Sequence, residues 1–251
     1  MKCIVIGGTG RIGSQVVSTL RSHGHDVVAA SPRTGVDALS GAGLAEALAG
    51  AAVVVDVSNA PSFADAAVME FFTTSTGHLL REGAAAGVRH HVALSVVGCD
   101  RVPDSGYLRA KAAQERLITQ SPIPYTIVRA TQFFEFVDSI VEAATTDGTV
   151  RVPPVSFRPI AAADVAAEVA RAAQAQPVNG VVEIAGPEEF RFDALVRDVL
   201  QARQDRRVVT DAQARYFGAV LGERSLVPLG AARYGEVRLR DWMAQTAAHS
   251  R

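Results

Sequence analysis

The first thirteen residues, MKCIVIGGTGRIG, place a short apolar run directly before a cluster of glycines. An apolar strand must end abruptly before a helix can begin, and glycine permits the tight turn that such a junction needs. The glycines follow a G-x-x-G-x-x-G spacing, and the next residues have helical periodicity. Backbone N–H groups at such a turn can approach a phosphate closely. The segment therefore predicts a dinucleotide-binding strand, turn and helix; the alternative is a turn that serves only strand-to-helix packing.

Length and charge limit what the rest of the chain can be. A chain of 251 residues can bury one substantial core, which favours one elaborated domain over two independent ones. The net charge of −1 offers no broad attraction to nucleic acid or to an anionic membrane. The apolar runs have the length of strands, and Lys2 is not followed by a signal peptide. We expect a cytoplasmic protein with neither nucleic acid nor membrane as a partner.

The cysteines and histidines give no metal-binding pattern. Cys3 and Cys99 lie in or just after apolar runs, without a C-x-x-C neighbour, so we expect reduced, packed thiols. His90 and His91 are adjacent, and on a strand they would face opposite sides of the sheet. We therefore expect no metal site.

Strand-like and helix-like segments alternate along the chain, which predicts an α/β fold with a Rossmann-type, doubly wound parallel sheet. The expected strands are Lys2–Ile6, Asp26–Ala30, Val53–Val57, His91–Leu94, Tyr125–Arg129 and Val181–Ala185. The expected helices between them are Arg11–Ser22, Gly43–Ala49, Ala64–Ala86, Leu108–Thr119 and Phe133–Thr146.

The pattern loosens past Gly148, where prolines interrupt the alternation. We expect residues 1–150 to form the dinucleotide-binding core, and 151–251 to complete the sheet edge at about 181–185 and form a small substrate-binding lobe. The two parts would make one integrated domain. Helices of the lobe are expected at Phe192–Leu200, Asp211–Leu221 and Val237–Ala244. A lobe over the carboxyl ends of the strands would form the substrate wall.

The end of the second expected strand indicates which dinucleotide is bound. NAD-preferring sites usually carry an acidic residue there, and this strand instead continues into Ser31, Pro32 and Arg33. A hydroxyl and a guanidinium can hold a 2′-phosphate, and Arg11 in the glycine loop can approach it from the other side. The alternative is that both arginines are solvated loop charges. NADP(H) is favoured, with NAD(H) as the alternative.

The segment Gly106–Lys111 contains Tyr-x-x-x-Lys at the start of an expected helix. Residues four apart share one helix face, and a nearby ammonium lowers the pKa of a phenol. Tyr107 can then donate a proton to a carbonyl oxygen as a hydride arrives, while Lys111 lowers its pKa and holds the cofactor ribose. Ser95, at the end of the fourth expected strand, can hydrogen-bond the same oxygen. The alternative is a surface Tyr–Lys pair.

The combination of GGTGRIG, SVVG, YLRAK and RATQFFEF resembles atypical short-chain dehydrogenase/reductases, specifically the NmrA-like NAD(P)H-binding family. The resemblance implies a Rossmann-type core with a small C-terminal lobe and NADP(H) more often than NAD(H). It places the segment from Ala130 to Phe134 beside the nicotinamide and substrate. It also brings Asn59 towards the cofactor, although Asn59 can equally be a turn-former before Pro61.

Two groups of binding residues follow. Cofactor contacts are expected from Gly7, Thr9, Gly10, Arg11, Ile12, Gly13, Ser31, Arg33, Asn59 and Gln132. Substrate contacts are expected from Phe133 and Phe134, for which the alternative is a place in the core.

The leading functional hypothesis is an NADPH-dependent oxidoreductase, a monomer or homodimer, that transfers hydride to a small carbonyl or quinone. Tyr107 would be the general acid, assisted by Lys111 and Ser95. One alternative is an NAD(P)H-binding, redox-sensing regulator without turnover. Another is an isomerase or lyase on the same scaffold, because a fold does not determine a reaction.

Overall fold

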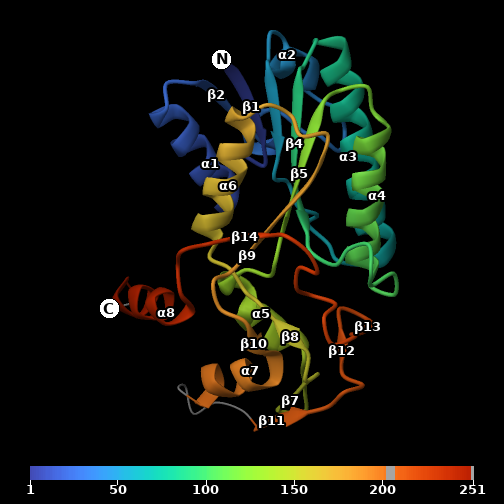
Figure 1. Ribbon diagram of the computed structural model, residues 1–251. Coiled ribbons are helices and arrows are strands. Elements are labelled where there is room, and N and C mark those ends of the chain that lie inside the picture. The colour runs from blue at the N-terminus through green and yellow to red at the C-terminus, as the bar shows by residue number, and fades with distance from the viewer. Residues whose placement is uncertain (202–206, 250–251) are drawn as a thin grey trace. The chain divides into compact units, whose positions relative to one another are not determined.

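The computed structural model describes residues 1–201 and 207–249, and its main feature is a seven-stranded sheet (Figure 1). The strand order is β14-β9-β5-β4-β3-β1-β2. The bounds are β1 Lys2–Ile6, β2 Asp26–Ala30, β3 Val53–Asp56, β4 His90–Val96, β5 Tyr125–Ala130, β9 Gly180–Ala185 and β14 Arg233–Tyr234. The pairs β1–β2, β1–β3, β3–β4 and β9–β14 are parallel. The predicted Rossmann-type fold is confirmed, and β14 is a strand that the sequence pattern did not reveal.

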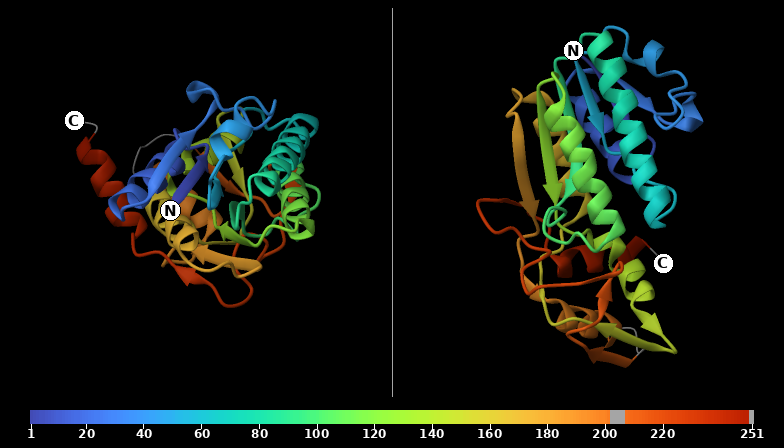
Figure 2. Two further views of the ribbon diagram at one scale, coloured as in Figure 1. Left: turned by 90° about the horizontal axis from the view of Figure 1, so that it is seen from above. Right: turned by 90° about the vertical axis from the view of Figure 1, so that its right-hand side faces the viewer.

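Helices cover both faces of this sheet. Figures 1 and 2 show α1 and α6 on one face and α3 and α4 on the other. The bounds are α1 Arg11–Ser22, α2 Leu44–Leu48, α3 Asp65–Ala85, α4 Gly106–Gln120 and α6 Ala162–Gln174, and the 3-10 turn η1 is Pro32–Thr34. Because helices lie on both sides, the central strands are apolar throughout: every residue of β3 is buried.

Two compact units make up the chain, and each takes segments from both halves of the sequence. The first unit consists of Met1–Ser95, Ala110–Arg129 and Ala163–Val182. The second consists of Val96–Arg109, Ala130–Ala162 and Glu183–Arg251. In the first unit, apolar side chains of β1, α2, β3 and α3, among them Ile4, Leu48, Val54 and Leu79, form one core cluster.

Short elements dominate the second unit. They are η2 Phe134–Phe136, α5 Val137–Ala143, β6 Thr145–Thr146, β7 Thr149–Val152, β8 Ser156–Phe157, β10 Phe190–Arg191, α7 Phe192–Gln201, β11 Arg207–Thr210, β12 Arg215–Tyr216, β13 Ala219–Val220 and α8 Leu239–His249. They form a three-stranded sheet β11-β7-β6 and two antiparallel pairs, β8–β10 and β12–β13. The buried aromatic residues of the second unit include Phe157 and Phe192, whose rings stack with centroids 4.5 Å apart.

Two expected helices of this region are wrong. The segment Asp211–Leu221 forms the hairpin β12–β13, because Phe217 and Gly218 adopt positive φ angles of 44° and 88° that an α-helix cannot contain. The segment Phe133–Thr146 is divided into η2, α5 and the short strand β6, whose Thr145 pairs with Val150. By contrast, the expected helix at Phe192–Leu200 is confirmed as α7.

Two further properties concern the described part of the chain as a whole. Every helix in residues 1–201 and 207–249 is too short or too polar to cross a membrane. Within the same residues, the structure gathers no group of three or more His, Cys, Asp or Glu side chains that could hold a metal ion.

Candidate cofactor and catalytic site

The glycine loop joins β1 to α1 as the sequence predicts. Gly7 has a φ of +76°, a conformation that side-chain-bearing residues rarely adopt. The N–H groups of Gly7 and Gly8 both donate to the Ala30 carbonyl, at 3.0 and 3.1 Å, and the Gly10 N–H donates to the Gly7 carbonyl at 2.9 Å. These bonds turn the chain so that Gly10 becomes the N-cap of α1.

At Gly8 and Gly13 the close backbone packing leaves no room for a side chain. A Cβ on Gly13 would lie 2.1 Å from the Gly7 carbonyl oxygen, and one on Gly8 would lie 2.7 Å from the Ala29 Cα. No side chain caps the N-terminus of α1, where backbone N–H groups lack intrahelical acceptors. The N-terminus of α1 is exposed, has no side-chain cap and follows a loop of closely packed glycines. Such a helix start fits the pyrophosphate of a dinucleotide.

The residues after β2 lie against the same loop. The Arg33 guanidinium donates to the Thr9 carbonyl at 3.3 Å, which places its charge beside the glycines. Ser31 is buried, and its Oγ has no hydrogen-bond partner among the described residues. The end of β2 therefore carries a buried hydroxyl and a guanidinium, and no carboxylate. Arg11 is exposed at the first position of α1.

The loop after β3 supports the glycine loop from the other side. A Cβ on Gly7 would lie 3.0 Å from the Ser58 Cα, so the two loops are in close backbone contact. Asp56 accepts hydrogen bonds from the Ser58 N–H at 3.0 Å and from the Ser58 hydroxyl at 2.6 Å. The exposed Asn59 accepts a hydrogen bond from the Ala60 N–H at 3.0 Å, and its cofactor contact stays a prediction.

Lys111 belongs to a buried polar network that the sequence did not reveal. Its ammonium donates to the Leu94 carbonyl at 2.8 Å and to the Gln114 side-chain oxygen, and it lies 4.2 Å from the centroid of the Phe72 ring. Gln114 in turn donates to Asp56 at 3.0 Å. Lys111 is 3% exposed and Asp56 1% exposed. The amide therefore links a buried cation to a buried carboxylate, and the network holds α4 against β3 and β4.

Replacing Lys111 by methionine is expected to lower the free energy of unfolding by about 2–4 kcal/mol, because it removes a buried cation that serves two acceptors. Chemical denaturation without cofactor measures this cost. Arg116→Ala, on an exposed position of α4, is the control and should change stability by less than about 0.5 kcal/mol. A Lys111→Met protein as stable as the control would contradict the anchoring role.

Tyr107 is the second residue of α4, one helical turn before Lys111. Burial raises the pKa of the Tyr107 phenol to about 12, with a smaller contribution from Cys99. The prediction that Lys111 lowers this pKa is therefore wrong for the protein described here: the loss of hydration outweighs any cation. The phenol is protonated throughout the neutral range. Ser95, in β4, is 5% exposed.

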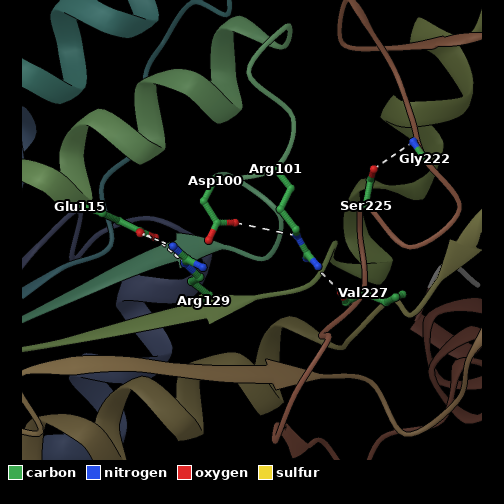
Figure 3. Close-up of polar contacts among 7 residues, drawn as sticks. All are labelled: Asp100, Arg101, Glu115, Arg129, Gly222, Ser225 and Val227. Atoms are coloured by element: carbon green, nitrogen blue, oxygen red, sulfur yellow. Dashed lines mark hydrogen bonds and ion pairs between the residues drawn. The ribbon is translucent and has the colours of Figure 1, made fainter.

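The loop between β4 and α4 is held by the C-terminal segment of the second unit. Arg101 donates to the Val227 carbonyl at 2.9 Å and lies 3.8 Å from Asp100, contacts drawn in Figure 3. A Cβ on Gly98 would lie 2.1 Å from the Ser225 carbonyl oxygen. This packing fixes the loop from which the helix of Tyr107 starts.

The segment after β5 carries buried polar atoms without partners. Both polar atoms of the Gln132 side chain and the Thr131 hydroxyl lack hydrogen-bond partners among the described residues. Such atoms are rare in proteins and are typical of sites that a ligand completes. Phe133 stacks on Phe136 with centroids 5.5 Å apart. Phe134 is 2% exposed and packs against Trp242, so its position is that of a core residue.

Glu115 and Arg129 form a second feature that sequence reasoning missed. The two side chains make a bidentate pair, with Nε–Oε1 at 2.9 Å and Nη2–Oε2 at 2.6 Å, joining α4 to β5 (Figure 3). In the sequence, an arginine inside the apolar strand and a glutamate on the preceding helix were the signals that could have indicated this pair. The aspartate that ends the apolar run Val53–Asp56 was the corresponding signal for the Lys111 network.

Comparisons with known proteins agree with this geometry. A family model described as NAD(P)H-binding matches residues 7–176. No curated protein sequence matches the chain.

Solved structures resemble the whole chain in fold. A short-chain dehydrogenase/reductase superfamily protein from Agrobacterium tumefaciens with bound NAD has 18% identity and a TM-score of 0.72, covering 100% of this chain and 97% of that one. The enzyme WbmG of Bordetella bronchiseptica, in complex with NAD and UDP, has 13% identity, coverage of 98% and 95%, and a TM-score of 0.68. An NADPH-dependent quinone oxidoreductase from Escherichia coli has 17% identity, coverage of 98% and 99%, and a TM-score of 0.67.

Proposed function

Because the chain belongs to the NAD(P)H-binding family and has the fold of short-chain dehydrogenase/reductase proteins, we propose that it is an NADPH-dependent oxidoreductase acting on a small carbonyl or quinone. The observation that carries this proposal is the glycine loop with the Arg33 guanidinium bonded to it. A quinone oxidoreductase that uses NADPH is among the structures with the same fold.

The phosphate groups of the cofactor would be held by residues of the first unit. The amides of Gly10 to Gly13 at the start of α1 would bind the pyrophosphate, assisted by the backbone at Thr9. Arg33, Ser31 and Arg11 would hold the 2′-phosphate. When bound, NADPH supplies the hydride that adds to the substrate's carbonyl carbon.

The protein's part in the reaction is to supply a proton and orient the substrate. The Tyr107 phenol, protonated at neutral pH because its pKa is about 12, would give its proton to the carbonyl oxygen, so that the product is an alcohol. The Ser95 hydroxyl would orient that oxygen. The Lys111 ammonium, held at the Leu94 carbonyl and Gln114, would place its positive charge one helical turn from Tyr107.

One observation favours a second candidate, a redox-sensing regulator that binds the cofactor without turnover. The ammonium of Lys111 is already bound to two acceptors, and the pKa of Tyr107 is raised rather than lowered. Turnover separates the two candidates: NADPH consumption with ketones, aldehydes or quinones supports the reductase. Tight binding of NADPH, without its consumption in the presence of any compound of this panel, supports the regulator.

Cofactor preference gives the first quantitative test. In a fluorescence titration we expect NADPH to bind more tightly than NADH. Arg33→Ala should weaken NADPH binding by about tenfold or more, because a charge-assisted contact to phosphate is lost, and should leave NADH binding unchanged. Arg116→Ala, an exposed arginine on α4, is the matched control. Tighter binding of NADH by the unmodified protein would refute the NADP(H) preference.

A further inference from the structure

The two carboxylate oxygens of Asp56 serve two different parts of the first unit. Oδ1 accepts the Ser58 N–H at 3.0 Å and the Ser58 hydroxyl at 2.6 Å, whereas Oδ2 accepts the Gln114 side-chain N–H at 3.0 Å. Asp56 is 1% exposed, so these protein donors take the place of water around its charge. One buried carboxylate therefore joins the loop after β3 to α4.

The Ser58 side of this carboxylate lies against the glycine loop. A Cβ on Gly7 would lie 3.0 Å from the N and Cα atoms of Ser58 and from the carbonyl carbon of Val57. The Val57 N–H donates to the Ile6 carbonyl at 3.0 Å, so the pairing of β1 with β3 continues up to this contact. Because the contact is made by backbone atoms on both sides, the position of Ser58 constrains the loop assigned to the pyrophosphate.

The Gln114 side of the carboxylate determines which group faces Lys111. An amide has one donor end and one acceptor end, whereas an ionised carboxylate only accepts. Since Asp56 takes the NH2 end of Gln114, the side-chain oxygen of Gln114 faces Lys111 and accepts from its ammonium. Gln114 is 1% exposed, so water does not offer the ammonium a different acceptor there.

We propose that Asp56 is a positioning residue for both the dinucleotide loop and Lys111. Through Ser58 it sets the backbone that contacts the glycine loop, and through Gln114 it provides the acceptor that holds the ammonium of Lys111 beside the Leu94 carbonyl. All of these residues belong to the first unit. The effect on turnover rests on the proposed function, whereas the effect on dinucleotide binding rests on the contacts of Asp56 itself.

Asp56→Asn tests this role because it keeps the shape of the side chain and changes one acceptor into a donor. If the new amide oxygen faces Ser58, its NH2 group meets the NH2 end of Gln114. Turning Gln114 over then presents that NH2 end to the ammonium of Lys111. Turning the new amide instead presents a donor to the Ser58 N–H. Every arrangement leaves one donor facing another donor in a buried place, so a hydrogen bond is lost.

NADPH binding, measured by fluorescence titration, is the first readout. We expect Asp56→Asn to weaken it about tenfold, because the unfavourable contact displaces either Ser58 beside the glycine loop or Lys111. A purely structural role of Asp56 would lower the melting temperature and leave the Kd of the folded protein unchanged.

The double variant Asp56→Asn/Gln114→Glu should restore binding to within about threefold of the unmodified protein. The new glutamate accepts from the asparagine NH2 group and from Lys111, and the total charge of the network stays the same. Asp26→Asn/Gln120→Glu makes the same exchange at exposed positions of β2 and α4, and this control should leave NADPH binding unchanged.

Turnover of an accepted carbonyl compound is the second readout. We expect kcat to fall about tenfold in Asp56→Asn and to recover in the double variant, since Lys111 regains its acceptor. The control variant should keep the kcat of the unmodified protein.

The outcomes separate this role from the proposed function. NADPH affinity that is lost in Asp56→Asn and restored in the double variant, without NADPH consumption by any protein, supports the positioning role and refutes the reductase. NADPH consumption by the unmodified protein, with affinity and kcat unchanged in Asp56→Asn, supports the reductase and overturns the positioning role.

The double variant also decides the remaining cases. If Asp56→Asn loses affinity and the folded double variant does not regain it, the positioning role is overturned. If Asp56→Asn alone does not fold, a folded double variant that binds NADPH within about threefold of the unmodified protein supports the role. A double variant that is also unfolded overturns it.

Discussion

Replacing Gly13 by alanine is expected to weaken NADPH binding by at least about 100-fold, which corresponds to about 2.7 kcal/mol. The added Cβ would lie 2.1 Å from the Gly7 carbonyl oxygen and 2.7 Å from the Gly8 Cα. Both obstacles are backbone atoms, so no side-chain rotation relieves the overlap, and the loop must move away from α1. Fluorescence titration with NADPH measures the loss.

Gly77→Ala is the control, because Gly77 also lies in a helix, α3, but an added Cβ there meets no atom within 4 Å outside its own stretch of helix. Alanine is the better helix former, so this variant should be more stable by about 0.5–1 kcal/mol and bind NADPH normally. A Gly13→Ala protein that is folded and binds NADPH within about threefold of the unmodified protein would contradict the phosphate-binding role of the loop.

Replacing Tyr107 by phenylalanine is expected to lower kcat by about 10²–10⁴-fold, the usual contribution of a general acid. Binding of NADPH should be unchanged, because the hydroxyl is assigned to the substrate. Steady-state kinetics with an accepted carbonyl compound provide the measurement. Tyr234→Phe, at a 52% exposed position in β14, is the control and should retain full activity. A Tyr107→Phe protein with normal kcat would refute the acid role.

The raised pKa of Tyr107 also determines the expected pH dependence. A phenol with a pKa of about 12 keeps its proton as the pH rises through the ordinary value of 10 and loses it only near 12. Deprotonation of Tyr107 should therefore not lower the kcat of reduction between about pH 7 and about pH 10. A Tyr107-dependent decline centred near pH 7 would mean that bound cofactor lowers the pKa far below its value in the protein alone.

Local sequence patterns predicted the first unit well. β1, β2 and α1 were predicted with their observed bounds, because apolar runs, glycine turns and helical spacing all agree there. The hairpin at Asp211–Leu221 was mistaken for a helix, because its apolar spacing also fits 3.6 residues per turn. Only the left-handed pair Phe217–Gly218 reveals the turn, and phenylalanine is not a residue from which such a turn would be predicted.

The contacts around Tyr107 and Lys111 could not be predicted from the sequence. The spacing of Tyr107 and Lys111 predicts that both lie on one helix face. It does not predict which groups of the sheet contact that face. The Leu94 carbonyl and the Gln114–Asp56 link come from elements far apart in sequence. The pKa of Tyr107 likewise depends on burial, which tertiary packing alone determines.

Transfer of deuterium from C4-deuterated NADPH to a carbonyl substrate tests the central claim most directly. The protein is incubated with the labelled cofactor and a panel of aldehydes and ketones, and the alcohols are analysed by mass spectrometry. We predict one deuterium on the carbinol carbon of at least one product, and its loss in the Tyr107→Phe variant. Tight binding of NADPH without any labelled alcohol, and without consumption of NADPH on quinones, would contradict the account.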